Sequence, residues 1–160
     1  MNIEEEVVAL LAKRHLTVTT AESCTGGLIA GTLVNVAGAS QVLNEGYITY
    51  SNEAKQRLAG VDARTLDRYG AVSEQTAREM AVGVAHAASA DMGLSATGIA
   101  GPDGGTEEKP VGLVYIGCCL GCETWVEKHV FEGTRGEIRR QSVEAALTLA
   151  KEALRKSEIS

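Results

Sequence analysis

Short strand-like runs alternate with amphipathic helical segments along this chain of 160 residues. Continuous or alternating apolar runs predict strands at about residues 16–20, 46–50, 92–96, 111–119 and 123–131. Apolar residues at helical spacing predict helices at about residues 3–14, 26–36, 52–60, 73–88 and 135–156. Elements that alternate in this way pack as helices on both faces of a sheet. We therefore predict an α/β fold, a layered α/β/α sandwich around a mixed sheet.

The last two predicted strands are expected to form an antiparallel hairpin within that sheet. Only Leu120, Gly121 and Cys122 join them, a connection of hairpin length.

Length and charge restrict what the chain can be. We expect one domain over residues 1–160, long enough to bury a substantial core. A formal net charge of −6 and few aromatic residues argue against nucleic acid as a partner, although a small anionic ligand held by a few local donors fits. The alanine-rich last helix favours a homo-oligomer.

The start of the chain is acidic, and no apolar run approaches the ~20 residues that span a bilayer. We therefore expect a cytoplasmic protein with no membrane partner.

The four cysteines leave two interpretations open. Cys119 and Cys122 have C-x-x-C spacing, which suggests a metal or redox site. No second Cys or His pair lies nearby to complete four ligands, and Cys118 and Cys119 fall within an apolar run. We favour buried structural cysteines and expect no metal.

The segment Thr19–Gly27 places two possible nucleophiles, Ser23 and Cys24, where a strand turns into a helix. Backbone N–H groups at a helix start are unpaired and favour negative charge. Gly26 and Gly27 would let a ligand approach that backbone closely. A nucleophile beside such donors suits acyl transfer. Cys24 is an alternative to Ser23, because a helix start lowers the pKa of a thiol.

A base for Ser23 is less obvious, since none of His15, His86 and His129 adjoins a turn or glycine-rich motif. Lys55 is the better candidate. With Asn52 as N-cap, Lys55 falls in a first helical turn, where the helix dipole and burial would lower its pKa. Tyr50, at the end of a predicted strand, could donate a hydrogen bond to an oxyanion. Spacing alone favours a surface lysine and a packed tyrosine.

Two further segments could bind a ligand. The loop Thr97–Thr106 holds four glycines after a buried strand, so it is either a binding loop or a tortuous connection. Arg135, Arg139 and Arg140 lie near the start of the last helix and could bind phosphate, or simply form a solvated helix face.

The order of several motifs is more informative than any one of them. "TAESCTGG", "GYITYSNEAK", "GAVSE", "TGIAGPDGG" and "KPVGLVYIG" follow one another along the chain. This series resembles the CinA C-terminal domain family, whose members include stand-alone nicotinamide-nucleotide amidases. The resemblance extends from about Glu4 to Leu154. Longer CinA proteins carry a separate N-terminal domain, and we expect this chain to be the stand-alone form.

The resemblance implies hydrolysis of nicotinamide mononucleotide to nicotinic acid mononucleotide and ammonia, in pyridine nucleotide salvage. It assigns the nucleophile to Ser23 and its assistants to Tyr50 and Lys55, with no cofactor. The expected substrate contacts are Thr25, Gly26, Gly27, Gly98, Gly101, Arg139 and Arg140. The alternative is a non-catalytic nucleotide-binding or regulatory module, which would not need Ser23 and Lys55 together.

Overall fold

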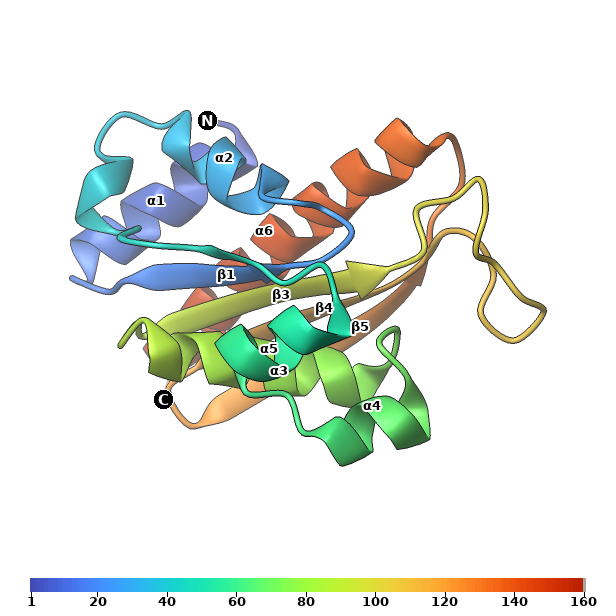
Figure 1. Ribbon diagram of the computed structural model, residues 1–160. Coiled ribbons are helices and arrows are strands. Elements are labelled where there is room, and N and C mark those ends of the chain that lie inside the picture. Colours follow the sequence, from blue (N-terminus) through green and yellow to red (C-terminus); the bar gives the residue numbers. More distant parts are fainter. Residues whose placement is uncertain (160) are drawn as a thin grey trace.

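A five-stranded mixed sheet forms the centre of the computed structural model, which describes residues 1–159 (Figure 1). The strands lie in the order β2-β1-β3-β4-β5. Their bounds are β1 Val18–Glu22, β2 Tyr47–Ile48, β3 Met92–Gly98, β4 Leu113–Leu120 and β5 Glu123–Val130. β1 is parallel to both β2 and β3, whereas β4 is antiparallel to β3 and β5. The predicted mixed sheet and hairpin are confirmed.

Helices cover both faces of the sheet, which confirms the predicted α/β/α layering. On one face lie α1 Ile3–Lys13, α2 Leu28–Val34 and α6 Arg135–Ile159. On the other face lie α3 Asn52–Ala59, α4 Ala63–Tyr69 and α5 Glu74–Ala87. A short 3₁₀ helix, η1, spans Ala39–Gln41. No helix among residues 1–159 has the length and apolar character needed to cross a membrane.

Each helical layer packs on its own apolar cluster. The cluster beneath α1, α2 and α6 is the larger one, and β1 contributes Val18 to it. The cluster beneath α3, α4 and α5 includes Ala21 from the same strand. Since side chains alternate across a strand, β1 is buried on both faces, which is typical of a central parallel strand.

Glycines bring α5 unusually close to its neighbours. A Cβ placed on Gly93 of β3 would lie 2.1 Å from the Ala81 carbonyl oxygen of α5. A Cβ on Gly83 of α5 would lie only 1.5 Å from the carbonyl oxygen of Ala59 in α3. The missing side chains therefore set how closely α3, α5 and the sheet pack.

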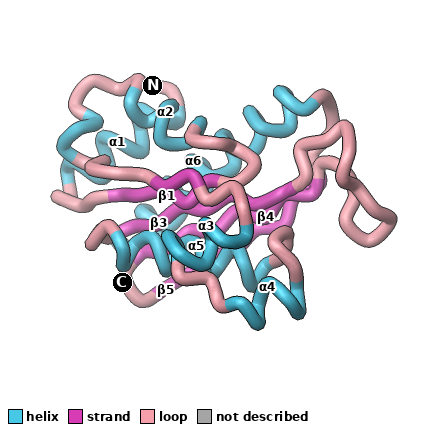
Figure 2. The backbone as a smooth tube through the Cα atoms, in the orientation of Figure 1, coloured by secondary structure: helices cyan, strands magenta, loops and turns pink. Residues whose placement is uncertain are grey.

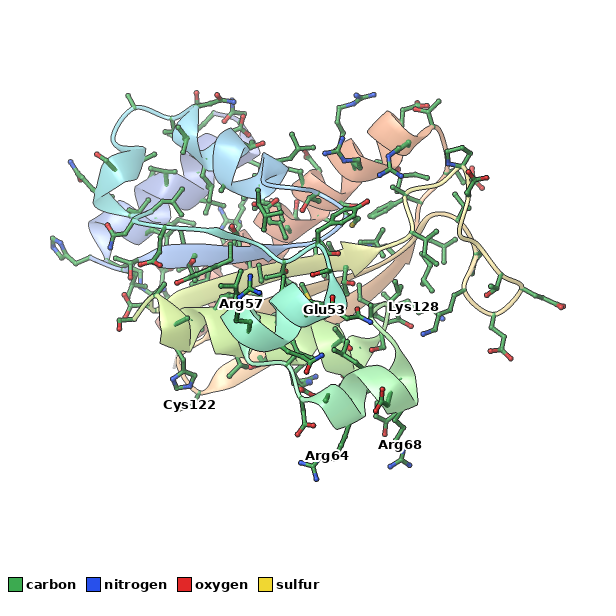
Figure 3. All side chains as sticks on the ribbon, viewed as in Figure 1. Glu53, Arg57, Arg64, Arg68, Cys122 and Lys128 are labelled. Carbon is green, nitrogen blue, oxygen red and sulfur yellow. The ribbon has the colours of Figure 1, made fainter. Side chains whose placement is uncertain are left out.

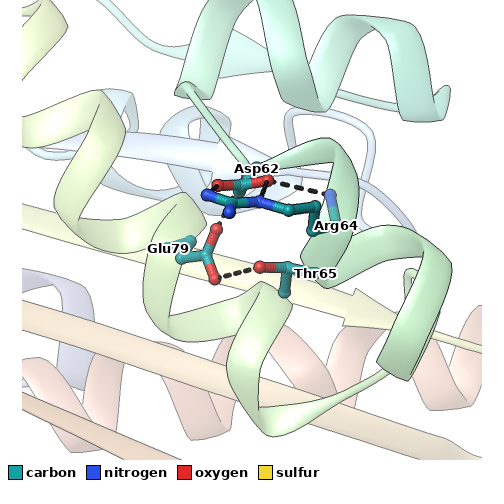
Figure 4. A network of polar contacts seen from close by, with 4 residues as sticks. All are labelled: Asp62, Arg64, Thr65 and Glu79. Carbon is teal, nitrogen blue, oxygen red and sulfur yellow. Dashed lines mark hydrogen bonds and ion pairs between the residues drawn. The ribbon is translucent and has the colours of Figure 1, made fainter.

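Residues 63–69, for which the sequence pattern predicts no element, form the helix α4. Asp62 caps this helix, and its side chain also contacts Arg64 (Figure 4). Glu79 of α5 accepts hydrogen bonds from the Asp62 amide and the Thr65 hydroxyl. These tertiary contacts hold a short helix that has little apolar periodicity of its own.

Other predicted boundaries shift by one to a few residues. The strand predicted at 16–20 spans Val18–Glu22, because the Leu16 amide still donates to the Leu11 carbonyl in the turn that follows α1. The strand predicted at 46–50 pairs only over Tyr47–Ile48. The helix predicted at 26–36 shortens to Leu28–Val34, since Gly26 and Gly27 have positive φ and form a turn.

The parallel strands end at one edge of the sheet. Ser23 follows β1, Thr49 follows β2, and the loop after Gly98 follows β3. That loop is one of the longest non-regular segments of the tube in Figure 2. In open α/β sheets, ligands bind outside the carboxyl ends of parallel strands, so this edge is where a site is expected.

The contact between α3 and α5 gives a stability prediction. Gly83→Ala should lower the free energy of unfolding by about 1–3 kcal/mol, because the added methyl group would overlap the Ala59 carbonyl. Gly31→Ala is the matched control, since a Cβ at helical Gly31 meets nothing within 4 Å. It should raise stability by about 0.5–1 kcal/mol. Urea unfolding followed by circular dichroism measures both, and equal effects would contradict the packing argument.

Candidate active site

A pocket of about 290 Å³ opens at the carboxyl ends of the parallel strands. Ser23 and Cys24 line it from the turn after β1, and Tyr50 and Lys55 from the segment after β2. Residues 97–101 and 103–104 form a further wall, and Arg135 lies at the start of α6. This volume is at the small end of ordinary ligand pockets, about 300–1,000 Å³. It suits a small molecule.

Lys55 brings its amine directly to Ser23. Its Nζ lies 3.0 Å from Ser23 Oγ, 2.9 Å from the Thr49 carbonyl oxygen and 3.1 Å from that of Tyr50. A neutral amine has two N–H groups and one lone pair. If the two carbonyls accept the N–H groups, the lone pair is directed at the Ser23 hydroxyl. The arrangement is therefore suited to removing the serine proton.

Burial prepares Lys55 for this task. The residue is 1% exposed, and desolvation of the ammonium lowers its pKa from 10.5 to about 8. Helix α3 begins at Asn52, within the predicted range, but Ser51 rather than Asn52 is its N-cap. Lys55 consequently makes the first full backbone hydrogen bond of α3, from its amide to the Ser51 carbonyl.

Tyr50 contacts Lys55 through its backbone carbonyl rather than through its side chain. Its carbonyl oxygen accepts from Lys55 Nζ and lies 3.5 Å from Ser23 Oγ, too far for a normal O–H···O bond. Its side chain is 63% exposed, and the hydroxyl lies 3.5 Å from Arg135 Nη2. The oxyanion donor that we expected from the Tyr50 hydroxyl is thus directed toward Arg135, and its catalytic role stays a prediction.

Glu22, which was not predicted as a site residue, ends β1 beside Ser23, and its side chain reaches the start of α2. Its buried carboxylate accepts hydrogen bonds from the Ile29 and Ala30 amides at 2.7 and 3.0 Å. Its backbone carbonyl accepts from the Thr49 amide at 2.9 Å. The amides at the start of α2, which we expected to be free for a ligand, are therefore satisfied by the protein itself. An acidic residue shortly before a helix start was the available signal.

The turn between Ser23 and α2 leaves other amides free. Gly26 donates its N–H to the Ser23 carbonyl at 3.1 Å. The Cys24 and Thr25 amides donate to no other residue among residues 1–159, although the Cys24 amide also faces its own thiol. Thr25, Gly26 and Gly27 do not line the pocket, so their roles as substrate contacts stay predictions.

Cys24 is poorly suited to be the nucleophile. Its side chain is buried, and desolvation raises the pKa of its thiol from 9.0 to about 11. A thiol with this pKa is almost fully protonated at neutral pH. Cys118 and Cys119 are buried in β4, as expected, and the C-x-x-C partner Cys122 is exposed on the hairpin turn (Figure 3).

The other predicted contact residues divide into two groups. Gly98 and Gly101 line the pocket. Arg139 instead donates to the Cys24 and Thr25 carbonyls at 2.9 and 3.3 Å, and Arg140 is exposed outside the pocket lining. Arg135, which was grouped with them in the sequence, lines the pocket and donates to the Gly101 carbonyl.

Comparison with known proteins agrees with this architecture. The family model for the CinA C-terminal domain matches residues 1–154. The chain is 56% identical over 153 residues to a CinA-like protein of Kosmotoga olearia, covering 96% of this chain and 37% of that protein. It thus spans little more than a third of the length of such curated relatives.

Solved structures match over nearly their full chains. The competence/damage inducible protein CihA of Agrobacterium tumefaciens has a TM-score of 0.90 and 43% identity, covering 96% of this chain and 95% of that one. A CinA superfamily protein of Klebsiella pneumoniae has a TM-score of 0.92 and 33% identity, with 96% of each chain covered. By sequence and by fold, this chain belongs to the CinA C-terminal domain family.

Proposed function

We propose that this protein is an amidohydrolase that converts nicotinamide mononucleotide into nicotinic acid mononucleotide and ammonia, as a step of pyridine nucleotide salvage. The observation that carries the proposal is the distance of 3.0 Å between Lys55 Nζ and Ser23 Oγ in a pocket of small-molecule size. The family resemblance supplies the substrate. A non-catalytic nucleotide-binding module would have no need of a buried lysine held against a serine.

In the proposed acylation step, neutral Lys55 accepts the Ser23 proton as Ser23 Oγ attacks the carboxamide carbon. The tetrahedral intermediate then collapses, and protonated Lys55 gives its proton to the departing nitrogen, which leaves as ammonia. Water next attacks the acyl-serine while Lys55 takes the water proton. That proton returns to Ser23 Oγ as the acid is released. Every proton is accounted for without a cofactor.

The oxyanion of each tetrahedral intermediate needs hydrogen-bond donors. We assign them to the amides of Cys24 and Thr25, because neither donates to another residue and both adjoin Ser23. The Gly26 amide is not available for this role, because it already donates to the Ser23 carbonyl. Loss of one such donor costs about 2.7–4 kcal/mol of transition-state stabilisation in other enzymes.

Ammonia release from nicotinamide mononucleotide tests the proposal directly. Ser23→Ala should lower kcat/KM by at least about 10³-fold, because no other group can form the acyl intermediate. Cys24→Ala should stay within about tenfold of the unsubstituted protein, since the backbone amide remains. Activity that survives Ser23→Ala but not Cys24→Ala would refute the serine mechanism. An unsubstituted protein that binds the nucleotide but releases no ammonia would favour the binding module.

The pH dependence of kcat/KM tests the role of Lys55. The base works only when neutral, so activity should rise as the pH passes through about 8 and level off above it. An ordinary lysine would move this rise to above pH 10. Lys55→Arg should abolish the reaction, because guanidinium stays charged. A flat profile between pH 7 and 9 would exclude Lys55 as the base.

Folding stability gives a test of the Lys55 pKa that needs no substrate. Between pH 8 and 10.5 the unfolded chain still binds a proton at Lys55, whereas the folded protein does not. Stability therefore rises with pH across this interval, by about 3 kcal/mol relative to Lys55→Met, which lacks the titrating group. Urea unfolding of both proteins at several pH values measures the difference. Parallel curves would show that Lys55 titrates normally.

A further inference from the structure

We propose that Arg135 binds the anionic end of the substrate, a phosphate monoester, and so determines specificity for a nucleotide over its nucleoside. This inference rests on the proposed function, because it concerns the same pocket. The residues alone left Arg135, Arg139 and Arg140 as candidates for phosphate binding, whereas the resemblance implied substrate contacts only for Arg139 and Arg140.

The three arginines at the start of α6 have different surroundings. Arg139 uses its guanidinium to hold the Cys24 and Thr25 carbonyls. Arg140 folds back along its own helix, where its Nη1 lies 3.3 Å from the position of a Cβ on Gly136. Arg135 alone among the three lines the pocket. Only Arg135 therefore presents a guanidinium to a ligand bound there.

Arg135 is also held in place with donors to spare. Its Nη1 donates to the Gly101 carbonyl at 2.8 Å, and its Nη2 lies 3.5 Å from the Tyr50 hydroxyl. A guanidinium has five N–H groups, so at least three remain available. Planar, bidentate donation is the geometry that suits phosphate oxygens. A guanidinium already anchored by a carbonyl loses less freedom when it binds.

Tyr50 connects Arg135 to the reacting end of the pocket. The Tyr50 carbonyl contacts Lys55 Nζ, whereas its hydroxyl lies beside Arg135. The two ends of the pocket are thus separated by about the length of one tyrosine residue. In nicotinamide mononucleotide, a pyridine ring and a ribose separate the carboxamide from the phosphate. A substrate with its amide at Ser23 extends its phosphate toward Arg135.

The charge of the pocket fits one anionic group. The charged or titratable side chains that line it are Lys55, Arg135, Asp103 and the weakly acidic groups of Cys24 and Tyr50. Lys55 is neutral when it acts as the base, and Cys24 stays protonated. Asp103 and Arg135 are both exposed, so water and salt weaken the repulsion from Asp103, whereas Arg135 can also donate hydrogen bonds directly to the phosphate. Arg135 is then the cation available to pair with the anion.

Kinetics with two substrates test this assignment. Arg135→Ala should lower kcat/KM for nicotinamide mononucleotide by about 10–100-fold, mainly by raising KM. The kcat/KM for nicotinamide riboside should change by less than threefold. The kcat/KM of Arg135→Lys for the nucleotide should lie between those of the unsubstituted protein and Arg135→Ala, because lysine keeps the charge but loses the bidentate geometry. Arg68→Ala is the matched control, since Arg68 is exposed on α4 and points away from the sheet (Figure 3). This substitution should leave kcat/KM unchanged for both substrates.

Two results would overturn the inference. Equal losses for both substrates would mean that Arg135 only anchors the loop at Gly101. A loss confined to Arg140→Ala would move the phosphate contact to that residue.

Binding separates failure of this inference from failure of the proposed function. Calorimetric titration of Ser23→Ala with nicotinamide mononucleotide needs no turnover, and adding Arg135→Ala should weaken binding at least tenfold. If the unsubstituted protein releases no ammonia from either substrate, the proposed function fails, and this titration alone decides on Arg135. Unchanged affinity, or no binding of the nucleotide, would overturn the inference.

Discussion

The burial of the Lys55 amine is the constraint on which the rest of the site depends. An ammonium group in a dry environment is costly, and the usual solution is a nearby carboxylate. Here the hydrogen-bond partners of Nζ are two backbone carbonyls and a hydroxyl. Glu22, the buried acid beside Ser23, binds the amides of α2 instead. A carboxylate directed at Lys55 would raise its pKa and remove the base, so the capping of α2 also protects the chemistry.

Glu22 also aligns the nucleophile Ser23 with the base Lys55. The Glu22 carbonyl accepts from the Thr49 amide, and the Thr49 carbonyl accepts from Lys55 Nζ. The side chain of Glu22 meanwhile fixes the helix that follows the Ser23 turn. Both partners are thus positioned by backbone hydrogen bonds between the ends of two parallel strands. The contact of Nζ with the Thr49 carbonyl thus links the position of the Lys55 amine to the pairing of β1 with β2.

The sequence predicts the layers of this fold because they depend on local patterns. Helical spacing and the hairpin connection were sufficient for α1, α5, α6 and the β4–β5 pair. The short helix α4 was missed because it depends on Glu79, a residue of another helix. The pairing of Ser23 with Lys55 likewise depends on contacts between segments that are distant in the sequence. Spacing alone made Lys55 an ordinary surface residue, and only the parallel contact of β1 with β2 brings it to Ser23. The resemblance identified both residues without explaining their proximity.

The arginines of α6 show where a local argument misleads. Residues four apart share a helix face, so spacing alone would let Arg135 and Arg139 face the same ligand. That face, however, passes two different parts of the site in succession. Arg135 reaches the Gly101 carbonyl of the loop after β3, whereas Arg139 reaches the carbonyls that follow Ser23.

Because α6 also packs on β4 and α1, it ties two walls of the pocket to the core. A lysine whose pKa is lowered by exclusion of water requires walls that stay in place. The long helix therefore supports the base from a distance, through contacts that no motif encodes.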